Sequence, residues 1–186
     1  MRRGPVTGPR FLGLSVLAFS LAASAVAEVR PVPFKSYLID RLSYGVYCAD
    51  PPVALEEAPG TAAGVVNVVP GLPEFRVETT VVPAEIGIAF GLVVEPRAGV
   101  VLDPVTVTIT HPPYPDSGVE VEQWITVIEG PSLVGFAFEL ESELVTGRWS
   151  FEGAQGEELL FVIEFDVVPP AMLPDLVQGC GGAMLS

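Results

Sequence analysis

Apolar and polar side chains alternate with a period of two along most of the chain beyond residue 60. The alternation is longest in residues 143–168, where two apolar runs flank the link Gly153-Ala154-Gln155-Gly156. Side chains alternate between the two faces of a strand, and a glycine-bearing link suits a hairpin. This stretch therefore predicts two antiparallel strands that end at Pro169-Pro170. The predicted inward positions are Val145, Gly147, Trp149, Phe151, Leu159, Phe161, Ile163, Phe165 and Val167.

Further short apolar runs, separated by proline and glycine turns, predict the remaining strands. We expect strands in residues 35–48, 61–69, 75–82, 86–94, 105–110, 119–129 and 133–140. Residues 49–59 are predicted to form a loop, and residues 171–178 one helical turn that Pro174 limits. About eight or nine strands with turns between them favour an all-β fold, an immunoglobulin-like antiparallel β-sandwich, over a barrel.

Two strands carry less regular patterns. In residues 119–129 the inward face stays open, because Trp124 and Ile128 share one face whereas Val121, Ile125 and Val127 share the other. In residues 86–94 the face opposite the apolar one consists of the small residues Gly87, Ala89 and Gly91. A face of small residues indicates that another segment packs closely there, and the N-terminal segment is one candidate.

The first 27 residues have the pattern of a secretory signal peptide. Arg2, Arg3 and Arg10 precede an apolar run in residues 11–22, and two A-x-A sequences end at Ala25 and Ala27. We expect cleavage after Ala27, with Ala25 as the other possible site and an uncleaved membrane anchor as the alternative. The domains are then a signal peptide in 1–27, a sandwich in 28–170 and a C-terminal tail in 171–186. The predicted location is the periplasm or the outside of the cell.

The charge of the chain bears on its partners. All 23 acidic residues but only six of the nine basic residues lie after residue 27. Nucleic acid and anionic membranes attract basic patches, so this charge disfavours both. After signal cleavage no remaining segment is long and apolar enough to insert into a membrane. The expected partner is thus an unknown envelope protein or ligand.

The chain contains two cysteines, Cys48 and Cys180. An even number of cysteines in an exported protein favours a disulfide bond, because the compartment is oxidising. Two free thiols and an intermolecular bridge are the alternatives. A pair between these positions would tie the C-terminal tail to the end of the first strand.

Few residues suggest a chemical site. His111 is the sole histidine, and a zinc site normally needs several His or Cys ligands. We interpret it as a strand-end residue beside a proline loop, with a metal or catalytic role as the alternative. Tyr114 and Trp124, with the small-residue face, are candidates for a binding surface, to which His111 is added as a surface candidate. Trp149 is assigned to the core.

Acidic residues offer two further chemistries. Asp116, Glu120 and Glu122 lie close in sequence and have the oxygen atoms that calcium prefers, although their spacing matches no EF-hand loop. Paired carboxylates for glycoside hydrolysis cannot be selected from so many acidic residues. Glutamates 139, 141 and 143 are interpreted as a solvated face. We therefore predict no catalytic residue, metal or cofactor.

An ordered set of short motifs runs along the chain beyond the signal peptide. The motifs are Glu78-Thr79-Thr80, Pro83-Ala84, Gly87 with Phe90-Gly91, Pro112-Pro113, Gly135-Phe136 with Phe138, Gly147 with Trp149, and Phe165 with Val167. This set resembles a bacterial family known as domain of unknown function DUF3859. The resemblance spans residues 38–168 and implies an exported or envelope-associated single sandwich domain, with no catalytic residues to carry over.

Three functional hypotheses follow. The first is an exported binding or protein-interaction module of the cell envelope without its own chemistry. The second is a hydrolase that uses acidic residues, with or without calcium. The third is an envelope assembly factor that acts by adding a strand to an exposed sheet edge.

Overall fold

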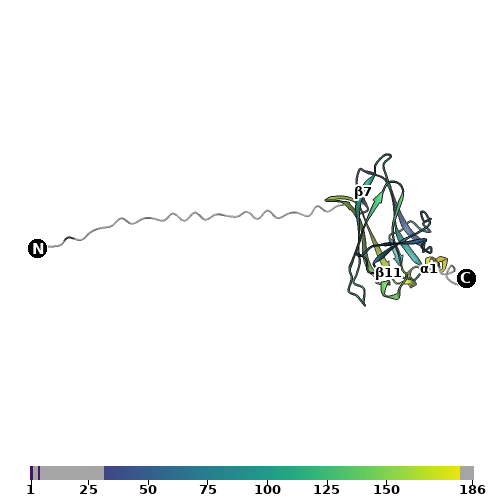
Figure 1. The fold of residues 1–186 in the computed structure, drawn as a ribbon. Coiled ribbons are helices and arrows are strands. Elements are labelled where there is room, and N and C mark those ends of the chain that lie inside the picture. Colours follow the sequence, from purple (N-terminus) through teal and green to yellow (C-terminus); the bar gives the residue numbers. More distant parts are fainter. Residues whose placement is uncertain (2–3, 5–31, 181–186) are drawn as a thin grey trace.

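The computed structural model describes residues 1, 4 and 32–180, in which two β-sheets pack face to face (Figure 1). The predicted signal peptide, residues 1–27, falls almost wholly outside these residues. The strands are β1 (Phe34–Lys35), β2 (Ile39–Cys48), β3 (Ala54–Glu57), β4 (Val65–Val68), β5 (Val81–Pro83), β6 (Ile88–Pro96), β7 (Leu102–Thr110), β8 (Val121–Ile128), β9 (Ser132–Ala137), β10 (Gly147–Gln155) and β11 (Glu158–Val168).

The larger sheet has the order β1-β11-β10-β7-β8, and the smaller sheet has the order β2-β6-β9. All of these neighbours are antiparallel, whereas β5 adds to β11 in parallel. Strands β8 and β9 follow each other in the chain but lie at the edges of different sheets. The all-β sandwich predicted from the alternation is therefore confirmed, and one side of it is bounded by two edge strands.

Aromatic side chains fill the space between the sheets. Trp149 and Phe151 of β10 and Phe165 of β11 are fully buried, and all three lie beside Phe90 of β6 with ring centroids 5.2–5.5 Å apart. Burying large rings between two sheets is the main stabilising term for such a domain. The predicted core position of Trp149 is confirmed. A bulge between Gly153 and Ala154 shifts the register, so that the next strand buries Leu160 more fully than the predicted Leu159.

Strand β8 presents its even-numbered positions to the interior. Ile128 is buried and Trp124 packs partly against the core, whereas the opposite face is open to solvent. The exposed face carries Val121, Ile125 and Val127, whose exposed fractions are 51%, 72% and 46%. The inward face that the sequence left open is thus the one with the tryptophan.

A separate hairpin of β3 and β4 lies outside the two sheets. Strand β3 falls in the stretch that was predicted to be a loop, so this prediction was wrong. The pattern did not reveal the strand, because its four residues are all exposed and show no apolar alternation. The strand predicted for residues 75–82 was largely wrong: Val77 forms an isolated bridge to Val46, and only β5 is regular. Arg76 and Glu78 interrupt the apolar pattern of this segment, and only Arg76 and Val77 bond to β2, through Val46, so it follows the edge of β2 without a continuous ladder.

The small-residue face of β6 is covered by parts of the chain other than the described N-terminal residues. Residues 34–35 pair with β11 on the other sheet. Ala89 is fully buried and, with Tyr47 of β2, lies among the residues beneath the β3–β4 hairpin. A side chain on Gly135 of β9, which pairs with Gly91, would collide with the Tyr47 hydroxyl. The close packing was predicted correctly, but the described part of the N-terminal segment does not supply it.

The C-terminal segment is fastened to the smaller sheet. Two 3₁₀ turns, Glu141–Glu143 and Pro170–Met172, precede the helix α1 (Pro174–Cys180). Pro174 begins this helix, where a missing N–H costs nothing, so the expectation that it would limit a helical turn was wrong. The predicted Cys48–Cys180 disulfide is confirmed, with 5.2 Å between the Cα atoms. None of the described helices is long and apolar enough to cross a membrane.

Candidate functional site

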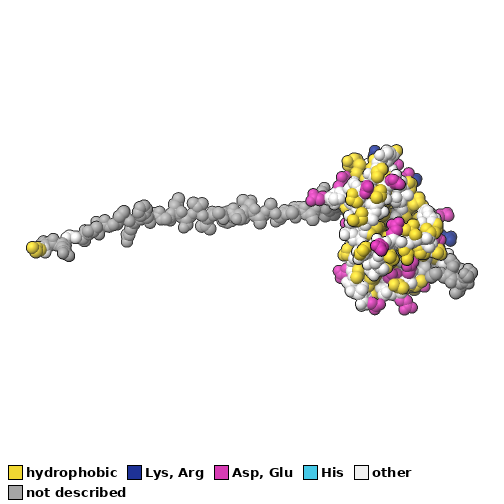
Figure 2. All heavy atoms as spheres, viewed as in Figure 1, with side chains coloured by type: hydrophobic (Ala, Val, Ile, Leu, Met, Phe, Trp, Pro, Cys, Tyr) yellow, Lys and Arg dark blue, Asp and Glu magenta, His cyan; other side chains and the backbone are white. Residues whose placement is uncertain are grey.

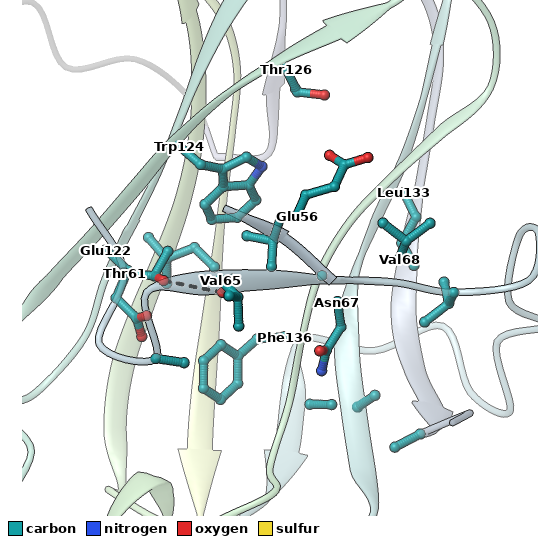
Figure 3. A pocket seen from close by; sticks show the side chains of 18 of the residues that line it. Glu56, Thr61, Val65, Asn67, Val68, Glu122, Trp124, Thr126, Leu133 and Phe136 are labelled. Carbon is teal, nitrogen blue, oxygen red and sulfur yellow. Dashed lines mark hydrogen bonds between the residues drawn. The ribbon is translucent and has the colours of Figure 1, made fainter. Parts of the chain in front are cut away.

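The candidate site is a groove between the β3–β4 hairpin and the edge strands β8 and β9. It has a volume of about 530 Å³, within the range of natural ligand sites. The hairpin crosses the strands behind it in Figure 3, with Val65, Asn67 and Val68 on the crossing strand. At this side of the sandwich the larger sheet ends at β8 and the smaller sheet ends at β9. The groove lies between these two edges, and the short hairpin bridges it.

Aromatic and small side chains form the apolar part of the groove. Trp124 of β8 and Phe136 of β9 are both half-buried and line it, together with Leu133. Ala89 and Gly135 contribute a surface with almost no side chains. Trp124 was predicted as a binding-surface candidate, and the structure places it in this groove.

The charged side chains that line the groove are all acidic. These residues are Asp50, Glu56, Glu122, Glu139 and Glu143. Acidic residues are also spread over the visible face of the domain, with few basic ones between them (Figure 2). The groove therefore has a negative potential next to an aromatic wall.

The hairpin is held to the sandwich at both ends. At β8, the backbone N–H of Gln123 donates to Gly60 O at 2.9 Å, and the N–H of Ala62 donates to Glu122 Oε2 at 3.0 Å. At the end of β9, Asn67 Nδ2 donates to Glu139 Oε1 at 2.9 Å. A two-stranded hairpin is marginally stable alone, so these contacts determine where it lies.

A buried polar network stands behind Glu122. Its carboxylate Oε1 accepts a hydrogen bond from the Tyr114 hydroxyl at 2.7 Å, and His111 Nε2 lies 3.4 Å from the same oxygen. The His111 ring is stacked between those of Tyr114 and Trp149, with centroids 4.1 and 4.5 Å away. His111 and Tyr114 were predicted as surface candidates, but each is only 4% exposed. The stacking explains the difference, because the loop after β7 folds both rings back against the core.

The tautomer of His111 follows from its partners. Its Nδ1 lies 2.8 Å from the carbonyl oxygen of Pro112, which can only accept, so Nδ1 carries a hydrogen. The distance of 3.4 Å from Nε2 to the carboxylate is long for a hydrogen bond. This nitrogen therefore lies beside the Glu122 carboxylate without an aligned hydrogen bond to it.

Opposing effects act on Glu122. Burial raises its pKa, but the adjacent His111 and the hydrogen bonds from Tyr114 and Ala62 lower it, and the net pKa lies below the ordinary value. Burial and the bond to this carboxylate raise the pKa of Tyr114, so its hydroxyl remains a donor. Glu122 is thus a buried carboxylate that links the hairpin to the core.

Glu143 lines the same groove in a different environment. Its Oε2 accepts hydrogen bonds from the backbone N–H groups of Glu139 and Leu140, at 2.8 and 2.9 Å. Burial raises the pKa of Glu143 above its ordinary value, and the nearby charges of Glu139 and Glu122 act in the same direction. The sequence interpretation as a solvated face was wrong for this residue, because the 3₁₀ turn directs it inward.

The three acidic residues considered for calcium do not come together. Asp116 and Glu120 are exposed on the loop before β8, whereas Glu122 points into the interior of the sandwich. Glu122 is also saturated by its own partners. Within residues 32–180, no group of three or more His, Cys, Asp or Glu side chains is arranged to hold a metal ion.

Sequence inspection missed Glu143 and the joint role of His111, Tyr114 and Glu122. The usable signal was the position of His111 directly after an alternating strand, three residues before Tyr114. That spacing in a proline-containing loop permits two rings to stack, but nothing in the sequence identifies Glu122 as their partner. The pairing of β7 with β8, which brings Glu122 opposite Ile109, supplies that information.

Comparison with known proteins gives a family and a likeness of fold. The family model described as Domain of unknown function (DUF3859) matches residues 35–167, which confirms the resemblance drawn from the ordered motifs. No curated protein matches the chain. Among solved structures, the chain is similar to an immunoglobulin-like protein from Pseudomonas aeruginosa, with 24% identity over 78% of this chain and 100% of that chain and a TM-score of 0.48. The family match includes the groove and the buried network.

Proposed function

The chain belongs to the Domain of unknown function (DUF3859) family, and from this premise we propose that it is an exported, non-catalytic protein-binding module of the bacterial cell envelope. The groove between the β3–β4 hairpin and the β8 and β9 edges is its binding site. The observation that carries the proposal is this groove, which places Trp124 and Phe136 beside acidic residues in a partly open cleft.

Export is supported by two features. The first 27 residues have the composition of a signal peptide. The Cys48–Cys180 disulfide is of the kind that forms in oxidising compartments. The acidity of the remaining chain bears on the partner instead, because it disfavours anionic lipid and nucleic acid.

The lack of its own chemistry is supported by how the polar groups in this region are occupied. Both cysteines are paired, and His111 lies behind the groove between two rings. Glu122 binds Tyr114 and Ala62, and Glu143 accepts two backbone N–H groups. For either carboxylate to react with a substrate, it would have to break these hydrogen bonds.

The test is capture of partners from an envelope extract with the exported chain as bait, followed by mass spectrometry. A Trp124→Ser variant should lose the captured partner because it removes the aromatic wall of the groove. The matched control is Val127→Ser on the same strand, whose side chain faces solvent on the opposite face. Loss with Val127→Ser and retention with Trp124→Ser would move the contact to the outer face of β8. Capture of no partner by the wild-type chain would refute the proposal.

A hydrolase is the second candidate, because two groove carboxylates have pKa values displaced in opposite directions. The pKa of Glu122 is lowered and that of Glu143 is raised, which are the directions expected for a base or nucleophile and for an acid. The check is turnover on a panel of glycans and peptides. Activity that Glu143→Gln abolishes, while the folded structure persists, would replace the binding module with an enzyme.

A further inference from the structure

The free edge of β9 faces the groove with its backbone. The N–H of Phe138 donates to Ile88 O on the β6 side. Every second residue of β9 bonds the same neighbour, so the N–H and C=O groups of Phe136 and Val134 also point toward β6. In an antiparallel ladder the intervening residues point their backbone groups the other way. These residues are Leu133, Gly135 and Ala137, and all three line the groove.

An added backbone would lie beside β9 in the plane of the smaller sheet, because β9 is the outer strand of that sheet. The face of the sheet at Gly135 offers no such room, since the Tyr47 hydroxyl already lies against it. A polypeptide in an extended conformation satisfies such an edge by forming hydrogen bonds at alternate residues. Among the loop and side-chain hydrogen bonds of residues 32–180, none engages the backbone of these three edge residues.

The charged groups fix the kind of side chain that such a segment would carry. Glu56 and Glu139 are exposed on the two sides of the groove, and the lining holds no Lys or Arg to neutralise them. In Figure 3 the side chains of Glu56 and Trp124 lie on the same side of the crossing hairpin strand. Carboxylates and an indole that line one groove favour a cation, because both kinds of group attract positive charge.

We propose that the groove takes an extended segment of a partner protein that carries lysine or arginine, paired to the β9 edge. Its backbone bonds Leu133, Gly135 and Ala137, and its basic side chains reach Glu56, Glu139 and the Trp124 ring. A partner chain is favoured over a small amine because the groove is open along its length and its free donors and acceptors are those of a strand edge. This inference rests on the proposed function, which names the groove as the binding site.

The experiment is selection of binders from a random dodecapeptide library displayed on phage, with the exported, disulfide-bonded chain as bait. The selected peptides should be enriched in Lys and Arg relative to the input library. A synthetic copy of the best binder should bind the Glu56→Gln, Glu139→Gln double variant at least tenfold more weakly. The amide oxygen introduced by Glu139→Gln can still accept the hydrogen bond from Asn67, so the hairpin keeps its anchor. The matched control is Glu157→Gln, Glu158→Gln, at the β10–β11 turn and the first position of β11, which removes the same charge at residues that do not line the groove.

Two further measurements test the mode of binding. Two N-methylated versions of the selected peptide, one methylated at the odd and one at the even positions, should be compared. Only one of them should lose binding, because a strand edge bonds every second residue of its partner. Raising the salt concentration should weaken binding, since exposed charges are screened.

The opposing results are distinct. A selection that yields no binders, yields peptides without basic enrichment, or yields binding that the double variant leaves intact would overturn the inference. Displacement of the peptide by equimolar 1,4-diaminobutane would assign the groove to a small amine and overturn it as well. If an envelope partner is still captured through Trp124 in any of these cases, the proposed function stands while this inference fails.

Discussion

Glu122 and Ala62 are 60 residues apart in the sequence, yet a hydrogen bond of 3.0 Å joins the carboxylate of the first to the backbone of the second. Through it the tip of the β3–β4 hairpin is connected to the buried Tyr114 and His111. The hairpin that covers the groove is therefore held by a group whose other contacts lie in the core of the sandwich.

Replacement of Glu122 by alanine should destabilise the fold and release the hairpin. The Tyr114 hydroxyl would lose its acceptor inside the protein, and Ala62 N–H would lose its partner. We expect the free energy of unfolding to fall by about 2–4 kcal/mol, because each buried polar group left without a partner costs about 1–3 kcal/mol. Urea denaturation measures the loss, and hydrogen exchange should show faster exchange at Ala62 and Gln123.

The matched control for this variant is Glu120→Ala. Glu120 lies two residues before Glu122, and its side chain is exposed. Surface substitutions of this type usually change stability by less than about 0.5 kcal/mol. Equal losses in the two variants would contradict the assignment of Glu122 as the connecting group.

The displaced pKa of Glu122 predicts how stability depends on pH. Since its pKa is lower in the folded state, its contribution is complete above the ordinary value of 4.5 and is lost as the pH falls through the folded pKa. The stability difference between wild type and Glu122→Gln should therefore be constant above about pH 5 and shrink below it. Urea unfolding at intervals between pH 3 and 8 measures this difference. A difference that grows on acidification would contradict the direction of the shift.

Glu143 should give the opposite dependence. Its folded pKa is raised, so the neutral form is favoured and its contribution is present below the ordinary value and lost as the pH rises through the folded pKa. Glu143→Gln keeps an oxygen that accepts from Glu139 and Leu140 N–H, and it removes the charge. The variant should therefore gain stability relative to wild type as the pH rises above about 4.5. No pH dependence of this difference would show that Glu143 is not shifted.

The strands with strict alternation could be predicted from the sequence because burial on one face leaves a period of two. Strands β10 and β11 and the core position of Trp149 belong to this group. The exposed strand β3 could not be predicted, because its four residues are all exposed and show no apolar alternation. Strand β8 itself could be predicted but its inward face could not, since both of its faces carry apolar residues.

The groove and the network behind it were largely beyond sequence inspection for a different reason. Both depend on contacts between residues distant in the chain, such as Asn67 with Glu139 and Tyr114 with Trp149. Residue types alone identified Trp124 as a candidate for a binding surface. Whether His111 lay on the surface or in the core was decided by the fold of a short proline loop, which the hydrophobic pattern does not specify.

The Cys48–Cys180 disulfide should contribute strongly to stability because it closes a long loop. The two residues are separated by 132 positions, and the chain-entropy model gives on the order of 4–5 kcal/mol as an upper figure for such a loop. The Cys48→Ala, Cys180→Ala double variant should lose stability by up to this amount in urea denaturation. Adding a reductant to the wild-type protein should reproduce the loss. Alkylation of two thiols in the untreated protein would contradict the bridge.

Gly60 tests whether the position of the hairpin matters for binding. A Cβ atom at this position would collide with the backbone carbonyl of Gln123, the same strand residue whose N–H donates to Gly60 O. Because a strand backbone cannot move aside as a side chain can, Gly60→Ala should displace the hairpin tip from β8. We expect a loss of about 1–3 kcal/mol, typical of overpacking, together with weaker capture of the envelope partner.

The control for this variant is Gly130→Ala, in the connection between β8 and β9. No atom lies within 4 Å of a Cβ added there, so stability and capture should change little. Hydrogen exchange at Gln123 and Ala62 separates the two possible causes of weaker capture. Faster exchange at these amides alone shows a displaced hairpin, whereas faster exchange throughout β10 and β11 shows a destabilised sandwich. Normal capture by a Gly60→Ala protein with a displaced hairpin would show that the hairpin is not part of the binding site.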